Sequence, residues 1–220
     1  MERLEAPVKA DLDNSKALQL AEWLTKTAVS GVGPLSSAEQ LAEEYLNDSS
    51  YKDNESRIEH LIRFEVSKNF ATGFVTGLGG FITLPVMIPA SIGASWLLQA
   101  RLVAAIARIY GHNISEDRVQ TAILLVIIGQ DLKEVLKQTG IRLGTQVSYR
   151  VIEKIPGAML TKINQLVGFR LLTKMGEKGV VNLVKLVPVV GGAIGGTVDA
   201  ISCRVVAQTA KKVFGCNTAP

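Results

Sequence analysis

NFATGFVTGLGGFITLPVMIPASIGASWLLQA, residues 69–100, contains no charged side chain, and Lys68 and Arg101 bound it. A helix that crosses a bilayer needs about 20 mostly apolar residues, so the run is long enough in total. Four glycines between residues 73 and 80, and then Pro85 and Pro89, interrupt it. Each proline removes a backbone donor and disfavours helix in the residue before it. The stretch therefore predicts a hairpin of two helices rather than one membrane-spanning helix.

The two halves of this run are predicted to continue into charged helices on either side. The first half ends near Leu78, and the second starts near Pro89 and runs to about Tyr110. Two placements are open, because such a hairpin can dip into one leaflet of a membrane or form the core of a soluble bundle. If it enters a membrane, the inserting side chains are expected to be Phe74, Phe81, Ile82, Leu84, Met87, Ile88 and Trp96.

The composition is aliphatic and weakly basic. Hydrophobic residues make up 47% of the 220 residues, aromatic residues only 5%, and the formal net charge is +4. Such a chain is long enough to bury a sizeable core. Cys203 and Cys216 form neither a disulfide framework nor a metal-ligand spacing, which fits a reducing compartment. The N-terminus has no signal-peptide core, so we expect a cytoplasmic location, with peripheral or monotopic attachment to the inner membrane as an option.

Charge is distributed unevenly along the chain. Residues 1–68 carry 8 basic and 13 acidic side chains, whereas residues 131–185 carry 10 basic and 4 acidic ones. The basic segment predicts a surface for an anionic partner such as membrane lipid. Solvated helix faces, or a network with the acidic N-terminal helices, are the alternatives. The candidate anion-binding residues are Arg142, Arg150, Lys162, Arg170, Lys174 and Lys178.

Helical periodicity dominates the rest of the chain. Residues 1–67 are predicted to form an acidic helical appendage, in which Ser36 and Glu39 have the spacing of a capping box. Residues 68–215 are predicted to form the core, followed by a short tail at 216–220. The expected helices outside the hairpin cover residues 12–29, about 38–46, 118–128, 132–138, a segment opened by Pro156, and 191–213. The predicted fold class is all-α, a multi-helix bundle with a Pro/Gly-broken apolar hairpin.

Small and charged residues inside the apolar runs suggest how these helices pack. Glycines four residues apart share a helix face and let backbones approach closely. Such pairs are Gly73 with Gly77, Gly191 with Gly195, and Gly192 with Gly196. They predict contact between the last helix and the hairpin, although Gly191 and Gly192 are also compatible with a turn. Arg101 and Asp199 are expected to form a buried pair, because an unpaired charge in apolar surroundings is costly; two wet helix ends are the alternative.

The sequence contains no motif that indicates a reaction. His60 and His112 lie in separate segments without ligand spacing, so no metal site is predicted. GxSxG, HExxH and CxxC are absent, and the glycine clusters do not match a phosphate-binding loop. We therefore predict no catalytic residues and no cofactor. Nucleic acid is not an expected partner, because the basic segment lacks interleaved aromatic residues.

From Lys68 to Gly215 the sequence resembles the EcsC family. The resemblance rests on FITLPV at 81–86, QAR at 99–101, GFRLLTK at 168–174, and PVVGGAIGGT at 188–197 followed by Asp199. It implies a helical bacterial protein, with membrane association as an expectation. It brings no catalytic residue with it.

These observations favour a non-enzymatic, membrane-associated scaffold or regulator that binds anionic lipid or a membrane protein. One alternative is a soluble helical bundle that presents its basic face to a protein partner. Another is an enzyme that acts on an apolar or lipid substrate. The sequence gives no indication of the oligomeric state.

Overall fold

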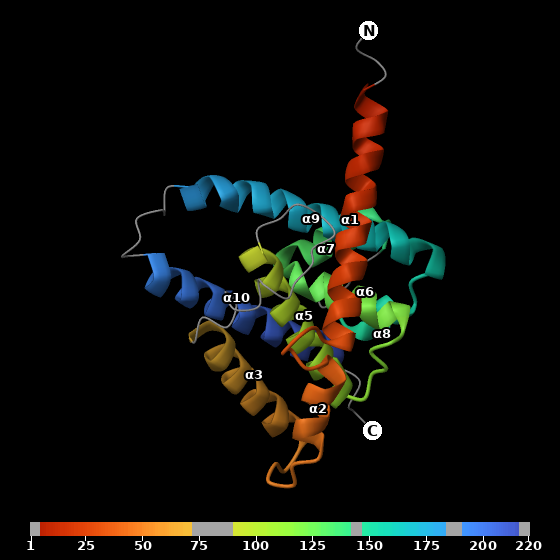
Figure 1. The fold of residues 1–220 in the computed structure, drawn as a ribbon. Coiled ribbons are helices and arrows are strands. Elements are labelled where there is room, and N and C mark those ends of the chain that lie inside the picture. Colours follow the sequence, from red (N-terminus) through yellow and green to blue (C-terminus); the bar gives the residue numbers. More distant parts are fainter. Residues whose placement is uncertain (1–4, 72–89, 142–146, 184–190, 216–220) are drawn as a thin grey trace.

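Nine α-helices and one short 3-10 helix make up the described part of the computed structural model (Figure 1). The backbone is described outside residues 1–4, 72–89, 142–146, 184–190 and 216–220, and the side chains outside 1–13, 68–91, 142–146, 174–199 and 216–220. The helices are α1 (Glu5–Ser30), α2 (Ala38–Leu46), α3 (Asn54–Ala71), α5 (Ala90–Ile109), α6 (Asp117–Ile127), η1 (Gly129–Asp131), α7 (Leu132–Gln138), α8 (Tyr149–Glu153), α9 (Gly157–Leu183) and α10 (Gly191–Phe214). No strand occurs in these ranges, which confirms the predicted all-α class.

Helix bounds follow the sequence pattern closely where strong breakers flank a helix. The helix expected from Pro89 to about Tyr110 is α5, and α7 has the predicted bounds. The first helix, by contrast, begins at Glu5 instead of near Leu12. Pro7 does not prevent this, because in a first turn proline lacks only a donor that would have no helical partner.

Helix α5 is the central element of the bundle, in contact with α1, α2, α3, α6 and α10. Its stretch Ile92–Ile109 is long and apolar enough to cross a membrane, but 89% of that stretch is buried inside the protein. Leu97 and Ile106 on α5 are fully buried together with Leu124 on α6 and Phe214 on α10. A helix that is apolar on all sides is expected to be either a core helix or a membrane span. The burial of α5 identifies it as the core helix of this fold.

The N-terminal helices contribute to the same core as the later ones. Leu20 and Leu24 on α1 are fully buried, and α1 packs against both α9 and α5. Helix α3 packs against α10, where Lys211 forms ion pairs with Glu55 and Glu59. Both parts therefore contribute to one hydrophobic cluster. The division into an appendage and a core near residue 68 stays a prediction.

The capping box of α2 lies one residue later than predicted. Ser37, rather than Ser36, is the N-cap: its Oγ accepts from the Gln40 backbone N–H at 3.0 Å. The Gln40 Oε1 accepts in return from the Ser37 backbone N–H at 3.0 Å. Both serines have an acidic or amide residue three positions later, so spacing alone did not distinguish them. The shift leaves Ser36 available for a contact with α5.

The turn between α1 and α2 depends on glycine at position 31. Gly31 has φ +81°, and a Cβ there would lie 2.6 Å from the Leu35 carbonyl oxygen. Gly111 has a similar φ of +89°, but nothing lies within 4 Å of its would-be Cβ. Gly111→Ala should therefore cost only the left-handed strain, about 1–2 kcal/mol, whereas Gly31→Ala should cost clearly more. Urea unfolding of the two variants measures the difference, and equal losses would mean that the turn can move aside.

Candidate functional site

Most of the basic residues predicted to bind anions lie on α9, which carries Lys162, Arg170, Lys174 and Lys178, while Arg150 lies on α8. Arg150 and Lys162 are exposed, and Arg170 is half-buried. The side chains of Arg142, Lys174 and Lys178 lie outside the described residues. Their role in binding anions stays a prediction.

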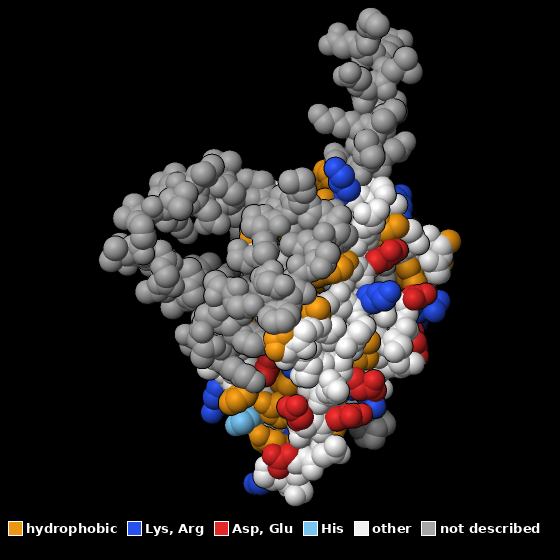
Figure 2. Space-filling model, in the orientation of Figure 1, with side chains coloured by type: hydrophobic (Ala, Val, Ile, Leu, Met, Phe, Trp, Pro, Cys, Tyr) orange, Lys and Arg blue, Asp and Glu red, His pale blue; other side chains and the backbone are white. Residues whose placement is uncertain are grey.

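Figure 2 shows the described side chains on one face of the molecule, coloured by type. Acidic side chains are scattered over its lower part, and small apolar areas lie between them. No continuous patch of Lys and Arg is visible among the coloured side chains of this face.

The side chains predicted to enter a membrane fall into two groups. Phe74, Phe81, Ile82, Leu84, Met87 and Ile88 lie outside the described residues. Trp96 lies on α5, is 9% exposed and belongs to the hydrophobic core. Trp96 is thus buried against protein in this structure, and the insertion of this group into a membrane stays a prediction.

The helix ends that flank the two uncharged runs lie on one side of the fold. These ends are the C-termini of α3 and α9 and the N-termini of α5 and α10, on the left of Figure 1. The chain between α3 and α5 belongs to the uncharged run 69–100, and the second uncharged run, 186–198, enters α10. The topology thus brings the entry and exit points of both runs to the same side.

Three of these four helices also carry the exposed large hydrophobic side chains of the described part. Phe64 on α3 is 49% exposed, Phe169 on α9 is 44% exposed, and Ile201 and Val205 on α10 are 64% and 53% exposed. Single exposed apolar residues are common on soluble proteins. Their restriction to α3, α9 and α10 is more informative, because these helices lead to the uncharged runs.

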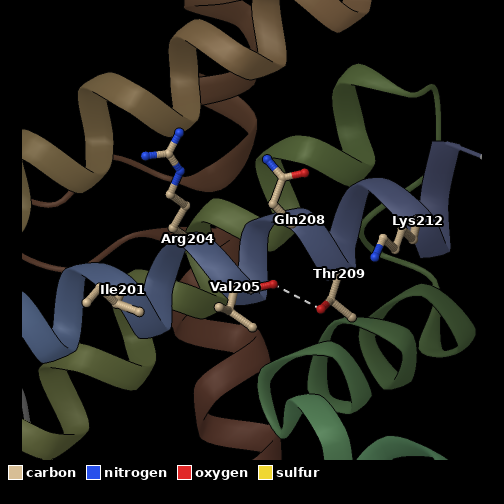
Figure 3. Close-up of a pocket in the computed structure, with 6 residues that line it drawn as sticks. All are labelled: Ile201, Arg204, Val205, Gln208, Thr209 and Lys212. Carbon is tan, nitrogen blue, oxygen red and sulfur yellow. Dashed lines mark hydrogen bonds between the residues drawn. The ribbon is translucent and has the colours of Figure 1, made fainter.

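A shallow hollow of about 430 Å³ lies on the outer face of α10 (Figure 3). The lining residues are Ile201, Arg204, Val205, Gln208, Thr209 and Lys212. They recur every three or four positions and so form one stripe of the helix. The opposite stripe, which includes Val206, Ala207 and Ala210, is buried in the core. In Figure 3, Arg204 and Gln208 point to one side of α10, and Val205 and Thr209 to the other.

The α10 hollow was missed from the sequence, although a signal was present. Ile201 and Val205 are four residues apart, with Arg204 between them, while the core positions of the helix form a separate stripe. Two apolar stripes on one helix cannot both face the same core. The basic side chains of the sequence are concentrated in residues 131–185, whereas the stripe on α10 adds only Arg204 and Lys212.

Arg101 is buried, as expected from its apolar surroundings, but its ionic partner is Glu65. The Arg101 Nη1 lies 2.9 Å from the Glu65 Oε2, and the two residues are 6% and 5% exposed. The Arg101 Nε donates to the Ser36 carbonyl oxygen at 2.7 Å, and Nη2 donates to Ser36 Oγ at 2.6 Å. The side chain of Asp199 lies outside the described residues. This arrangement joins α5, α3 and the α1–α2 turn, and we read it as structural.

Glu65 could have been found as the partner from the helical pattern. It lies on the same stripe of α3 as Ile58, Leu61 and Ile62, all of which are buried. A carboxylate at a core position needs a partner of opposite charge. The position of Glu65 on the buried stripe of α3 therefore predicts that it forms a buried ion pair, as the apolar surroundings of Arg101 do for Arg101.

A close approach between two helices involves a different glycine from those predicted. A Cβ on Gly168 of α9 would lie 1.9 Å from the carbonyl oxygen of Ala17 on α1. Gly191, Gly192, Gly195 and Gly196 lie in the first two turns of α10, and their surroundings, with Gly73 and Gly77, lie outside the described residues. The contact between those glycines stays a prediction.

The two histidines make structural contacts. The Tyr51 hydroxyl and His60 Nδ1 are 2.8 Å apart, and His112 Nε2 donates to the Phe214 carbonyl oxygen at 3.1 Å. Burial raises the pKa of the nearby Tyr45 and Tyr149 hydroxyls, which keeps both neutral. Within the described ranges, no three His, Cys, Asp or Glu residues come together as metal ligands.

Comparison with known proteins identifies the family. The model of the EcsC protein family matches residues 2–216, nearly the whole chain. The match includes the N-terminal residues that the motifs quoted from the sequence did not cover. No curated protein and no solved structure matches the chain. The chain belongs to the EcsC protein family.

Proposed function

We propose that the protein binds the anionic inner surface of a membrane, without catalysing a reaction, and serves as a scaffold or regulator of membrane machinery. The observation that carries this proposal is the gathering of helix ends: both uncharged runs join the described fold on the same side. An attachment there can reach lipid while α5 and the rest of the core keep their packing.

Two forces contribute to such binding. Each large apolar side chain that leaves water for lipid contributes about 1.5–3 kcal/mol. Each Lys or Arg near an anionic surface contributes about 1 kcal/mol, and salt screens this part. The proposal assigns the first force to the apolar hairpin around residues 73–88 and the second to exposed cations such as Arg150 and Lys162. Binding should therefore have a salt-resistant and a salt-sensitive component.

Vesicle flotation tests whether binding has a salt-resistant and a salt-sensitive component. The purified chain should float with vesicles that contain phosphatidylglycerol, and high salt should release only part of it. The double variant Phe81→Asp and Ile82→Asp should lose the salt-resistant part, because two carboxylates are costly in hydrocarbon.

The matched control is Ser49→Asp with Ser50→Asp, which adds the same two charges to the exposed loop between α2 and α3. This control should float like the wild type apart from a small electrostatic loss. Complete release of the wild type by salt, or normal flotation of the Phe81 and Ile82 variant, would contradict insertion of the hairpin.

A further inference from the structure

We infer that the outer face of α10 from Ile201 to Lys212, called here the α10 stripe, contacts the headgroup layer of an anionic bilayer. This inference rests on the proposed function and adds a surface to it that neither the hairpin nor the basic segment includes. The α10 stripe consists of the six residues that line the hollow in Figure 3.

The exposure of the α10 stripe is the first argument. Ile201 and Val205 are the two most exposed large hydrophobic residues of the described part, at 64% and 53%. They are one helical turn apart, so they form a continuous aliphatic strip. Removing such a strip from water is favourable. The core stripe on the opposite side of α10 can stay buried while the strip contacts a partner.

The charges around the strip determine which partner fits. Arg204 and Lys212 lie beside the aliphatic side chains, and the other described lining residues, Gln208 and Thr209, are uncharged. Glu59 on α3 lies near Arg204 and Gln208, but Lys211 pairs with it and holds the pKa of its carboxyl below its usual range. The two acidic groups on this side of α3, Glu55 and Glu59, are thus both bound to Lys211. A partner that approaches the α10 stripe meets cations and aliphatic groups.

The shape of the hollow favours a lipid surface over a small ligand. A site for a small molecule is usually a deep cleft lined from several elements. This hollow is open, and the described residues that line it all come from one helix. An amphipathic helix that lies in the plane of a membrane has this chemistry: aliphatic side chains at the level of the headgroups, with Lys and Arg beside them. Long cationic side chains can then reach the phosphates while their stems cover apolar surface.

The experiment is flotation with phosphatidylglycerol vesicles over a series of salt concentrations. Arg204→Glu should weaken binding at low salt by about fivefold or more, the factor that corresponds to about 1 kcal/mol for a lost cation. Ile201→Ser with Val205→Ser should weaken binding at every salt concentration, because it removes apolar area. Circular dichroism and urea unfolding should show an intact fold for both variants, since all three side chains are exposed.

A control makes the result specific to the α10 stripe. Lys52→Glu makes the same charge change on the exposed loop between α2 and α3. This variant should bind more tightly than Arg204→Glu. If Lys52→Glu loses as much as Arg204→Glu, the attraction is diffuse and the inference is overturned.

The outcomes also separate this inference from the proposed function. If the wild type floats and the α10 variants float equally well, the α10 stripe is not a contact surface, and membrane binding by the hairpin stands. If the wild type does not float with any anionic vesicle, the proposed function fails and this inference fails with it.

Discussion

Arg101→Met is expected to lower the free energy of unfolding by about 3–5 kcal/mol, because it breaks a buried ion pair by removing one of its two charges. Arg101 and Glu65 are 2.9 Å apart, and both are almost fully buried. The substitution also removes the two hydrogen bonds from Arg101 to Ser36 in the α1–α2 turn. Chemical denaturation of the purified chain measures the effect.

Arg108→Met is the matched control on the same helix. Arg108 forms an ion pair with Glu39 at 3.4 Å, but the two side chains are 35% and 51% exposed. An exposed pair of this kind contributes about 0–1 kcal/mol. In addition, Arg101→Met combined with Glu65→Met should be less destabilising than the sum of the two single changes. Similar losses for Arg101→Met and Arg108→Met would mean that the buried ion pair does not stabilise the fold.

Gly168→Ala is expected to have an effect of similar size, at least about 3 kcal/mol, because it places a methyl group against the backbone of α1. The added Cβ would lie 1.9 Å from the Ala17 carbonyl oxygen and 2.9 Å from the Ala17 Cα. Backbone atoms in a packed helix cannot move aside as a flexible side chain can, so α1 and α9 have to separate. The variant should melt at a lower temperature, and α1 should become more accessible to proteases.

Gly157→Ala provides the comparison within the same helix. Gly157 opens α9, and nothing lies within 4 Å of its would-be Cβ. Alanine is preferred over glycine in a helix by roughly 0.5–1 kcal/mol, so this variant should be unchanged or slightly more stable. If Gly168→Ala also keeps the wild-type stability, the close crossing of α1 and α9 is not a feature of the folded protein.

The helices were predictable where sequence signals are local. Pro89 marks the start of α5, the spacing of apolar residues marks α1 and α6, and Gly140 follows the end of α7. The burial of Arg101 was also predictable, because the residues around it are apolar. These signals depend only on neighbours within a few turns of the same helix.

Contacts between distant segments were not predictable in the same way. The partner of Arg101 lies 36 positions earlier in the chain, and several carboxylates were available to it. The search for close helix contacts looked for pairs of glycines, whereas the observed contact pairs Gly168 with an alanine. The α10 stripe was overlooked because its two cations are too few to stand out in a count of charges. Each of these features depends on which helix faces meet, and local periodicity does not determine that.

The N-terminal residues illustrate the same limit. Their acidic composition and separate helices predict an appendage, a division that stays a prediction, and the family match begins at residue 2. Leu20 and Leu24 lie in the same hydrophobic cluster as Ile106 on α5. The spacing of apolar residues identified the buried stripe of α1, but it did not show which helices cover that stripe.

Fractionation of the native cells tests the central claim, membrane association, most directly. The membrane pellet is washed with high salt and then with alkaline carbonate, and the protein is followed in each fraction. We predict that the chain sediments with membranes, that salt removes only part of it, and that the remainder resists carbonate. Recovery of all of the protein in the soluble fraction would contradict the account, and the uncharged run at 69–100 would then belong to the core of a soluble bundle.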